Sequence, residues 1–273
     1  MKQILVATDF SQSAGNALAY AFSMAGQLEM EVVAIHAIYP TEGINNSTYN
    51  AIFIEDYYSK KRSALKEWSA KIAEMSHFDQ NRLSTLCDVG FLRTVINRYA
   101  AKNTVELLVL GITGSTGIMG IVGSNASSIV SSIRIPTLII PPESSFPSHP
   151  VITLATDYQT RLSSQDLGAL DELIRCSKEQ KIGVVYVGEK PDTGQVVSGE
   201  IQLRALLPQV KIDFNYLKGR DAANGITDFI KENHTDIICL VKHHHNMIYS
   251  LFTGSTVNRM ISRSVRAILI LHD

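Results

Sequence analysis

Two stretches of this 273-residue chain begin alike, and this internal repeat constrains the fold more than any other feature of the sequence. Residues 2–9 read KQILVATD and residues 150–157 read PVITLATD. Each is an apolar run that ends in Ala-Thr-Asp and precedes a serine-containing helical pattern. The two copies also close alike, on the apolar runs IPTLII (135–140) and RAILIL (266–271). Such self-similarity predicts two units of the same design.

A proline-rich segment separates the two copies. It reads PPESSFPSHP at 141–150, and its prolines block regular structure. The Gly-Ser pair at 123–124 recurs at 254–255 with a smaller offset than the opening strands have, so the second copy is shorter in its middle. We therefore predict two domains, residues 1–141 and 150–273.

Apolar runs alternate with helical patterns in both copies. The expected strands are Gln3–Ala7, Glu31–Ala37, Arg82–Cys87, Val105–Leu110, Thr137–Ile140, Ile152–Ala155, Gly183–Val187, Val210–Tyr216, Ile237–Val241 and Ala267–Leu271. The expected helices of the first copy are Ser11–Leu28, Tyr57–Ser76, Leu92–Lys102 and Ser124–Ser132, with Ser11 as an N-cap. Continuous apolar strands between helices indicate parallel sheets covered on both faces. The predicted fold is α/β, with two doubly wound domains, each a five-stranded parallel sheet in the order 3-2-1-4-5.

Composition and charge exclude several classes of protein. The 45% hydrophobic content is that of a globular chain, and 25 Lys and Arg against 26 Asp and Glu leave a net charge of −1. No basic field exists to attract nucleic acid or an anionic membrane. The three cysteines form no CxxC pair, which argues against a disulfide framework or a zinc knuckle. Apolar runs are too short to span a bilayer, and Asp9 interrupts any signal-peptide core, so we expect a cytoplasmic protein.

The sequence places a ligand where the strand order reverses, between the first and fourth strands of the first copy. The fourth strand runs into GITGSTGIMGIVGSN (111–125), a segment with five glycines that leads into a helical pattern. Glycines let backbone N–H groups approach an anion, and a helix N-terminus favours negative charge. The segment holds no Lys or Arg, and it matches neither the Walker A pattern nor GxGxxG after the first strand. A surface loop without a ligand remains the alternative.

These residues resemble the universal stress protein family. The resemblance rests on ILVATDFS at the first strand, VVAIHAI at the second, DVG at 88–90, and LGITG, GSN and IPTLIIP towards the end of the copy. It extends to both halves and implies a tandem universal stress protein. The family's nucleotide-binding branch carries Gly-x2-Gly-x9-Gly-Ser/Thr. Here Gly111, Gly114 and Gly123-Ser124 match, with one residue fewer between the second and third glycines.

The resemblance implies a stress-response or regulatory protein that binds an adenine nucleotide (ATP, ADP or AMP, with or without Mg²⁺) in the N-terminal domain. It implies that Asp9 accepts a hydrogen bond from the nucleotide and that Ala37 presents its backbone to the adenine. The residues expected to bind the nucleotide are Ala7, Thr8, Asp9, Ala37, Leu110, Gly111, Gly114, Gly123, Ser124 and Asn125. Two local alternatives stay open: Asp9 forms an Asx-turn into the first helix, and His36 is a locally bonded strand-end residue.

The second copy departs from this pattern. Lys242 and His245 take the places of Gly111 and Gly114, so we expect no equivalent nucleotide site there. The adjacent histidines at 243–245 cannot all point at one ion without distortion, and we interpret them as a solvated or interface loop rather than a metal site.

A binding protein with at most slow ATP hydrolysis fits the sequence better than an enzyme. Asp9 is the only plausible acid near the glycine-rich segment, and no catalytic residues are assigned. The alternative from a different class is a scaffold of the same fold that binds no nucleotide. In single-domain members of the family the last strand pairs across a dimer. We therefore expect Thr137–Ile140 and Ala267–Leu271 to pair within the chain as a pseudo-dimer, and a homodimer remains open.

Overall fold

The computed structural model describes residues 1–40, 42, 51–112, 132–158, 162–188, 193–218, 221–242 and 265–272. Its strands are β1 (Gln3–Ala7), β2 (Glu31–Ile38), β3 (Leu83–Val89), β4 (Val105–Gly111), β5 (Thr137–Ile140), β6 (Ile152–Ala155), β7 (Lys181–Gly188), β8 (Lys211–Lys218), β9 (Ile237–Lys242) and β10 (Ala267–His272). Its α-helices are α1 (Gln12–Leu28), α2 (Ala51–Met75), α3 (Leu92–Ala100), α5 (Gly168–Cys176), α6 (Thr193–Leu206) and α7 (Ala222–Glu232).

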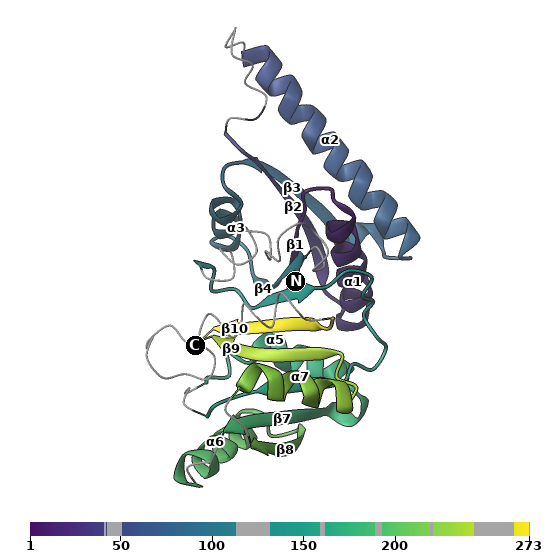
Figure 1. Cartoon of the computed structure of the whole chain (residues 1–273). Helices are drawn as coiled ribbons and strands as arrows, with labels where there is room; N and C mark the ends of the chain where they lie inside the picture. Colours follow the sequence, from purple (N-terminus) through teal and green to yellow (C-terminus); the bar gives the residue numbers. More distant parts are fainter. Residues whose placement is uncertain are drawn as a thin grey trace.

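All these strands form one ten-stranded sheet that runs through the whole molecule (Figure 1). Its order is β3-β2-β1-β4-β5-β10-β9-β6-β7-β8. Read from its outer edge inwards, each half has the order 3-2-1-4-5, which confirms the predicted fold class. Within each half the neighbouring strands are parallel, as expected for strands joined through helical crossovers.

The two halves meet through their last strands. β5 and β10 pair antiparallel, with Leu138 opposite Leu269 and Ile139 opposite Ile268. Every residue of both strands is buried. The predicted pairing of the two final strands is therefore confirmed. It provides hydrogen-bond partners for backbone groups that would be unpaired if either apolar strand were an exposed edge.

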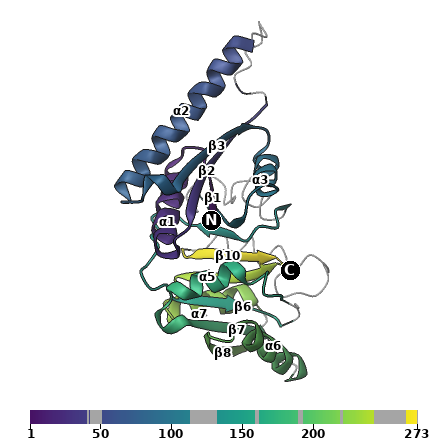
Figure 2. The ribbon, with the colours of Figure 1, turned by 180° about the vertical axis from the view of Figure 1, so that it is seen from behind.

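Side chains alternate between the two faces of the sheet and build two separate cores. Ile4 and Val6 of β1 belong to the core under α1, α2, α5 and α6, whereas Leu5 and Ala7 belong to the core under α3 and α7. Both cores continue across the β5–β10 junction. Helix α5 lies on the far face of the second half in Figure 1 and on the near face in Figure 2, which shows the molecule from behind.

Helix α1 follows the sequence prediction closely. The Ser11 Oγ accepts the Ala14 N–H (3.2 Å between N and O), so Ser11 is the N-cap, and the helix begins at Gln12. Ala14, Leu18, Ala21 and Ala25 all lie buried on one face.

Several element boundaries differ from the prediction by one or two residues, and one differs by six. Helix α2 begins at Ala51 rather than Tyr57, and the intervening residues contain no Gly or Pro that would end it; in Figure 1 it extends well beyond the sheet. Strand β3 continues to Val89 rather than Cys87, because Asp88 and Val89 still pair with Ala37 and Ile38 of β2. The helix predicted at Ser124–Ser132 falls outside the described residues, apart from Ser132. No helix in the described ranges is long and apolar enough to cross a membrane.

Candidate functional site

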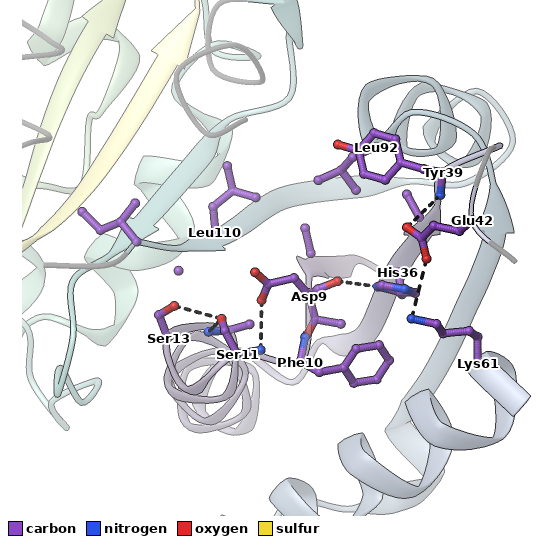
Figure 3. Close-up of a pocket in the computed structure, with 16 residues that line it drawn as sticks. Asp9, Phe10, Ser11, Ser13, His36, Tyr39, Glu42, Lys61, Leu92 and Leu110 are labelled. Atoms are coloured by element: carbon purple, nitrogen blue, oxygen red, sulfur yellow. Dashed lines mark hydrogen bonds and ion pairs between the residues drawn. The ribbon is translucent and has the colours of Figure 1, made fainter. Parts of the chain in front are cut away.

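A cavity of about 410 Å³ lies at the carboxyl ends of β1, β2 and β4 (Figure 3). This is the edge at which parallel strands place ligands, and β1 and β4 are neighbours in the sheet although β4 is the fourth strand along the chain. The cavity is lined by Ala7, Thr8, Asp9, Phe10, Ser11, Ser13, Ala14, His36, Ala37, Tyr39, Glu42, Lys61, Leu92, Leu110, Gly111 and Ile112.

The structure brings together six of the residues predicted to bind nucleotide. The six are Ala7, Thr8, Asp9, Ala37, Leu110 and Gly111. They lie at the ends of three strands or directly after them, and they converge because β1 pairs with both β2 and β4. The other four predicted residues, Gly114, Gly123, Ser124 and Asn125, lie outside the described residues. Gly117 and Gly120, the remaining glycines of that segment, do so as well.

Asp9 stands at the centre of the cavity, between the end of β1 and the start of α1. Its Oδ1 accepts the Ser11 N–H (3.0 Å), which is the Asx-turn considered as an alternative reading of this residue. Asp9 is nevertheless exposed, and the turn uses one oxygen of its carboxylate. The second oxygen can accept a ligand hydroxyl, so the turn and a ligand contact are compatible. Figure 3 shows the carboxylate between Ser11 and the open space of the cavity.

Gly111 is required by the packing of the protein itself. A Cβ at this position would lie 2.3 Å from the Ser13 carbonyl oxygen and 3.2 Å from the Ala14 nitrogen. The end of β4 therefore passes directly against the backbone of the first turn of α1. The sequence pattern predicts that this glycine allows a phosphate to approach, whereas in the structure a glycine is required by the close approach of the α1 backbone.

His36 forms the floor of the β2 side of the cavity. Its Nδ1 lies 2.8 Å from the Thr8 carbonyl oxygen, and because a carbonyl only accepts, Nδ1 must carry the proton. This confirms the interpretation of His36 as a locally bonded strand-end residue. The ring is buried and stacks at 4.7 Å, in a tilted arrangement, on Phe10.

A charged cluster of Glu42, Tyr57 and Lys61 closes the same side. Glu42 Oε2 accepts the Tyr57 hydroxyl (2.9 Å) and lies 3.7 Å from Lys61 Nζ, while Oε1 accepts the Tyr39 N–H (3.3 Å). Lys61 also lies over the rings of Phe10 and Tyr57. Burial opposes ionisation of Glu42, but these donors and Lys61 hold the pKa of its carboxyl below the usual value of 4.5. The carboxylate is therefore charged and held in one place at neutral pH.

Sequence reasoning missed this cluster. Residues 111–125 contain no Lys or Arg, so the sequence predicted a site without a cation. Lys61 nevertheless reaches the cavity from α2, far from that segment along the chain. A weak signal existed, because Tyr57 and Lys61 are spaced four residues apart and so share one face of the predicted helix. Nothing in the sequence indicated which way that face points.

Among the described residues of the second half, the Phe10–His36 ring pair has a counterpart made of two tyrosines. Phe10 and Tyr158 are counterparts: both have positive φ (66° and 56°), and both donate their N–H to the threonine Oγ1 two residues earlier. Strand registers make Tyr186 the counterpart of His36. Tyr158 stacks on Tyr186 with 5.9 Å between ring centroids.

Helix α6 packs against this pair of tyrosine rings. A Cβ at Gly199 would lie only 2.3 Å from Tyr158, so the glycine lets the helix pack against the ring. Asp157, the counterpart of Asp9, is 2% exposed, whereas Asp9 is exposed. The remaining predicted features of this copy, His243 to His245 and Gly254-Ser255, lie outside the described residues. Within the ranges described, no group of three or more His, Cys, Asp or Glu is placed to hold a metal ion.

The geometry fits a small organic ligand with hydroxyl or amino groups. A cavity of this volume is in the range of small-molecule sites, and its walls combine apolar side chains with a few fixed polar groups. The described lining carries two carboxylates, Asp9 and Glu42, and one cation, Lys61. Carboxylates accept hydrogen bonds from ribose hydroxyls and from the amino groups of bases.

Comparison with protein families matches residues 1–141 to a model described as the universal stress protein family. Among curated proteins, no sequence matches this chain.

Solved structures give matches along the whole chain. A universal stress protein from Archaeoglobus fulgidus is 15% identical, with a TM-score of 0.76 over 98% of this chain and 97% of that one. A putative universal stress protein from Pseudomonas aeruginosa is 12% identical, with a TM-score of 0.58 over 99% and 92%. At these identities the matches show the shared fold. A structure described as a universal stress protein in complex with cAMP (18% identical, 51% of this chain, 96% of that one) has a TM-score of 0.39, too low for its ligand site to be compared.

Proposed function

Because the chain belongs to the universal stress protein family, we propose that it is a stress-response protein that binds ATP or another adenine nucleotide in its N-terminal half. The observation that supports this most is the cavity at the ends of β1, β2 and β4, lined by six residues that the nucleotide-binding pattern selects. We further propose that residues 1–141 form the nucleotide-binding domain and residues 150–273 a second domain without an equivalent site.

The cavity has a direction that suits a nucleotide. At its β4 side, Leu110, Gly111 and Ile112 lead into the glycine-rich segment, where the sequence predicts the phosphates. At its β2 side lie Ala37 and the charged cluster of Glu42, Tyr57 and Lys61. The base would therefore occupy the β2 side and the ribose the centre, beside Asp9. Mg²⁺ would accompany the phosphates, for which it commonly keeps water and one or two carboxylates as ligands.

A binding role rather than an efficient catalytic one follows from the charges around the cavity. Lys61, the cation of the described lining, is held by Glu42 and two aromatic rings on the base side. A group in that place cannot stabilise a phosphoryl group in transfer at the other side. We therefore propose at most slow hydrolysis of the bound nucleotide.

A pocket-filling variant tests the proposal. Ser13 lines the β4 side on the first turn of α1, and Ser13→Phe would place a ring in the cavity. Ser23→Phe is the matched control, because Ser23 lies exposed on the same helix. In equilibrium dialysis with labelled ATP, the intact protein and the Ser23 variant should bind, and the Ser13 variant should lose at least about tenfold in affinity. Absence of ATP binding by the intact protein would favour the scaffold alternative.

A further inference from the structure

The two sides of the cavity differ in their charged groups, and this difference bears on how a nucleotide would lie. Glu42, paired with Lys61, lies on the β2 side and Asp9 in the centre, whereas the described residues of the β4 side are the neutral Leu110, Gly111, Ile112 and Ser13. A polyphosphate on the β2 side would meet the Glu42 carboxylate, and the Lys61 ammonium there is already paired with that carboxylate. The base side of the nucleotide carries no such charge, so it can approach Glu42 without repulsion.

The Glu42 carboxylate retains capacity for a further hydrogen bond. Each carboxylate oxygen offers about two acceptor sites. Among the described residues, Oε1 accepts one bond, the 3.3 Å contact from the Tyr39 N–H, while Oε2 is used by Tyr57 and Lys61. The side chain is 32% exposed and lines the cavity. A ligand N–H can therefore reach an oxygen that is already oriented.

The cluster of Glu42, Tyr57 and Lys61 holds the Glu42 carboxylate rigidly. Tyr57 and Lys61 are one turn apart on α2 and contact the same carboxylate oxygen, and Lys61 is fixed in turn over Phe10 and Tyr57. Two consecutive elements, the turn after β2 and helix α2, thus define the position of one acceptor. Preorganised acceptors discriminate because a ligand that lacks the matching donor leaves them without a partner after losing water.

We propose that Glu42 is the residue that determines base specificity in this pocket, by accepting an N–H from the 6-amino group of adenine. Lys61 and Tyr57 are positioning residues that hold its carboxylate. This inference rests on the proposed nucleotide-binding function and deepens it. The base would present its amino edge to the β2 side, next to Ala37.

The test compares two ligands that differ in one group. Purine riboside triphosphate lacks the 6-amino group of ATP and is otherwise the same, so the ratio of the two affinities isolates the amino contact. The ratio also cancels the general gain in affinity for triphosphates when a negative charge is removed. Isothermal titration calorimetry with the full chain would measure both dissociation constants, and GTP would serve as a third ligand.

Three variants accompany the intact protein. Glu42→Leu removes the acceptor, and Glu42→Gln keeps a neutral one. Glu55→Leu is the matched control, since Glu55 is an exposed glutamate on α2 that pairs with Arg62 and does not line the cavity. Circular dichroism would establish that each variant is folded.

We expect the intact protein and the Glu55 variant to prefer ATP over purine riboside triphosphate by about tenfold to a hundredfold. In Glu42→Leu the preference should fall to within about threefold, and Glu42→Gln should keep part of it. An unchanged preference in a folded Glu42→Leu protein that binds ATP would overturn this inference while leaving the proposed function standing. Tighter binding of GTP than of ATP by the intact protein would also overturn it. No ATP binding by the intact protein would overturn both.

Discussion

The two halves of the molecule share one strand order, yet they use the same corner of the fold differently. In the N-terminal half, Phe10 packs in a tilted arrangement on His36, and both rings line the cavity at the carboxyl ends of β1, β2 and β4. In the C-terminal half, Tyr158 stacks on Tyr186 and is packed under α6. A residue with the same positive φ and the same N–H to threonine contact thus lines a cavity in one half and lies within a tyrosine stack in the other.

The comparison shows that the backbone motif alone does not make a site. Both halves keep the Ala-Thr-Asp end of their first strand, but Asp9 is exposed and Asp157 is buried. Part of this difference in exposure comes from where the next helix of each half begins. Helix α1 starts three residues after Asp9, whereas α5 starts at Gly168, well beyond Asp157. The first half therefore places a helix N-terminus beside its cavity.

The largest expected effect is the loss of stability when Tyr158 of the second half is replaced. Tyr158→Ala should destabilise the protein by about 3–5 kcal/mol, because it deletes a buried ring and leaves a space under α6. Phe10→Ala should cost clearly less, since Phe10 is only partly buried and borders a cavity already present. Urea unfolding followed by circular dichroism measures both. Equal losses for the two variants would contradict the contrast between the halves.

An intermediate effect is expected for the glycine at the end of β4. Gly111→Ala should destabilise the fold by about 1–3 kcal/mol, because the new Cβ would collide with backbone atoms of α1 that cannot move independently. Gly26→Ala is the control: Gly26 is exposed in α1 with nothing near its Cβ position, so that change should stabilise by up to about 1 kcal/mol. Thermal unfolding of the two variants decides. If Gly111→Ala keeps full stability but loses ATP binding, the glycine serves the ligand instead of the packing.

The smallest expected effect is a pH dependence of stability that comes from Glu42 in the first half. The pKa of Glu42 is lowered in the folded protein, so its contribution to stability is present above the unfolded pKa near 4.5 and is lost as the pH falls through the lower folded value. Glu42→Gln should therefore lower stability slightly at pH 7 and converge with the unmodified protein in acid. Unfolding midpoints measured from pH 7 to pH 3 would show this. A difference that does not shrink as the pH falls would mean that Glu42 acts through packing and not through its charge.

Local signals predicted most of the fold. Apolar runs and helical spacing located the strands, the Ser11 cap located the start of α1, and the repeat indicated that both halves share one order. The pairing of β5 with β10 was predictable because an apolar edge strand requires a partner. These features depend on neighbours in sequence or on general rules of sheets.

The candidate site was predictable only where it is built from strand ends. Thr8, Ala37 and Leu110 converge because of strand order, which the sequence pattern supplies. Lys61 and Glu42 could not be found in the same way, since their meeting depends on how α2 is rotated over the sheet. The structural reason for a glycine at position 111 could not be predicted either, because only the packed α1 backbone shows that a Cβ does not fit there.

Calorimetric titration of the intact, unmodified chain with Mg-ATP tests directly the proposal that one half binds nucleotide and the other does not. We predict a stoichiometry close to one nucleotide per chain, and that the Ser13→Phe variant loses this binding. A stoichiometry near two, or binding that survives a blocked first-half cavity, would contradict the proposal that only the first half binds nucleotide.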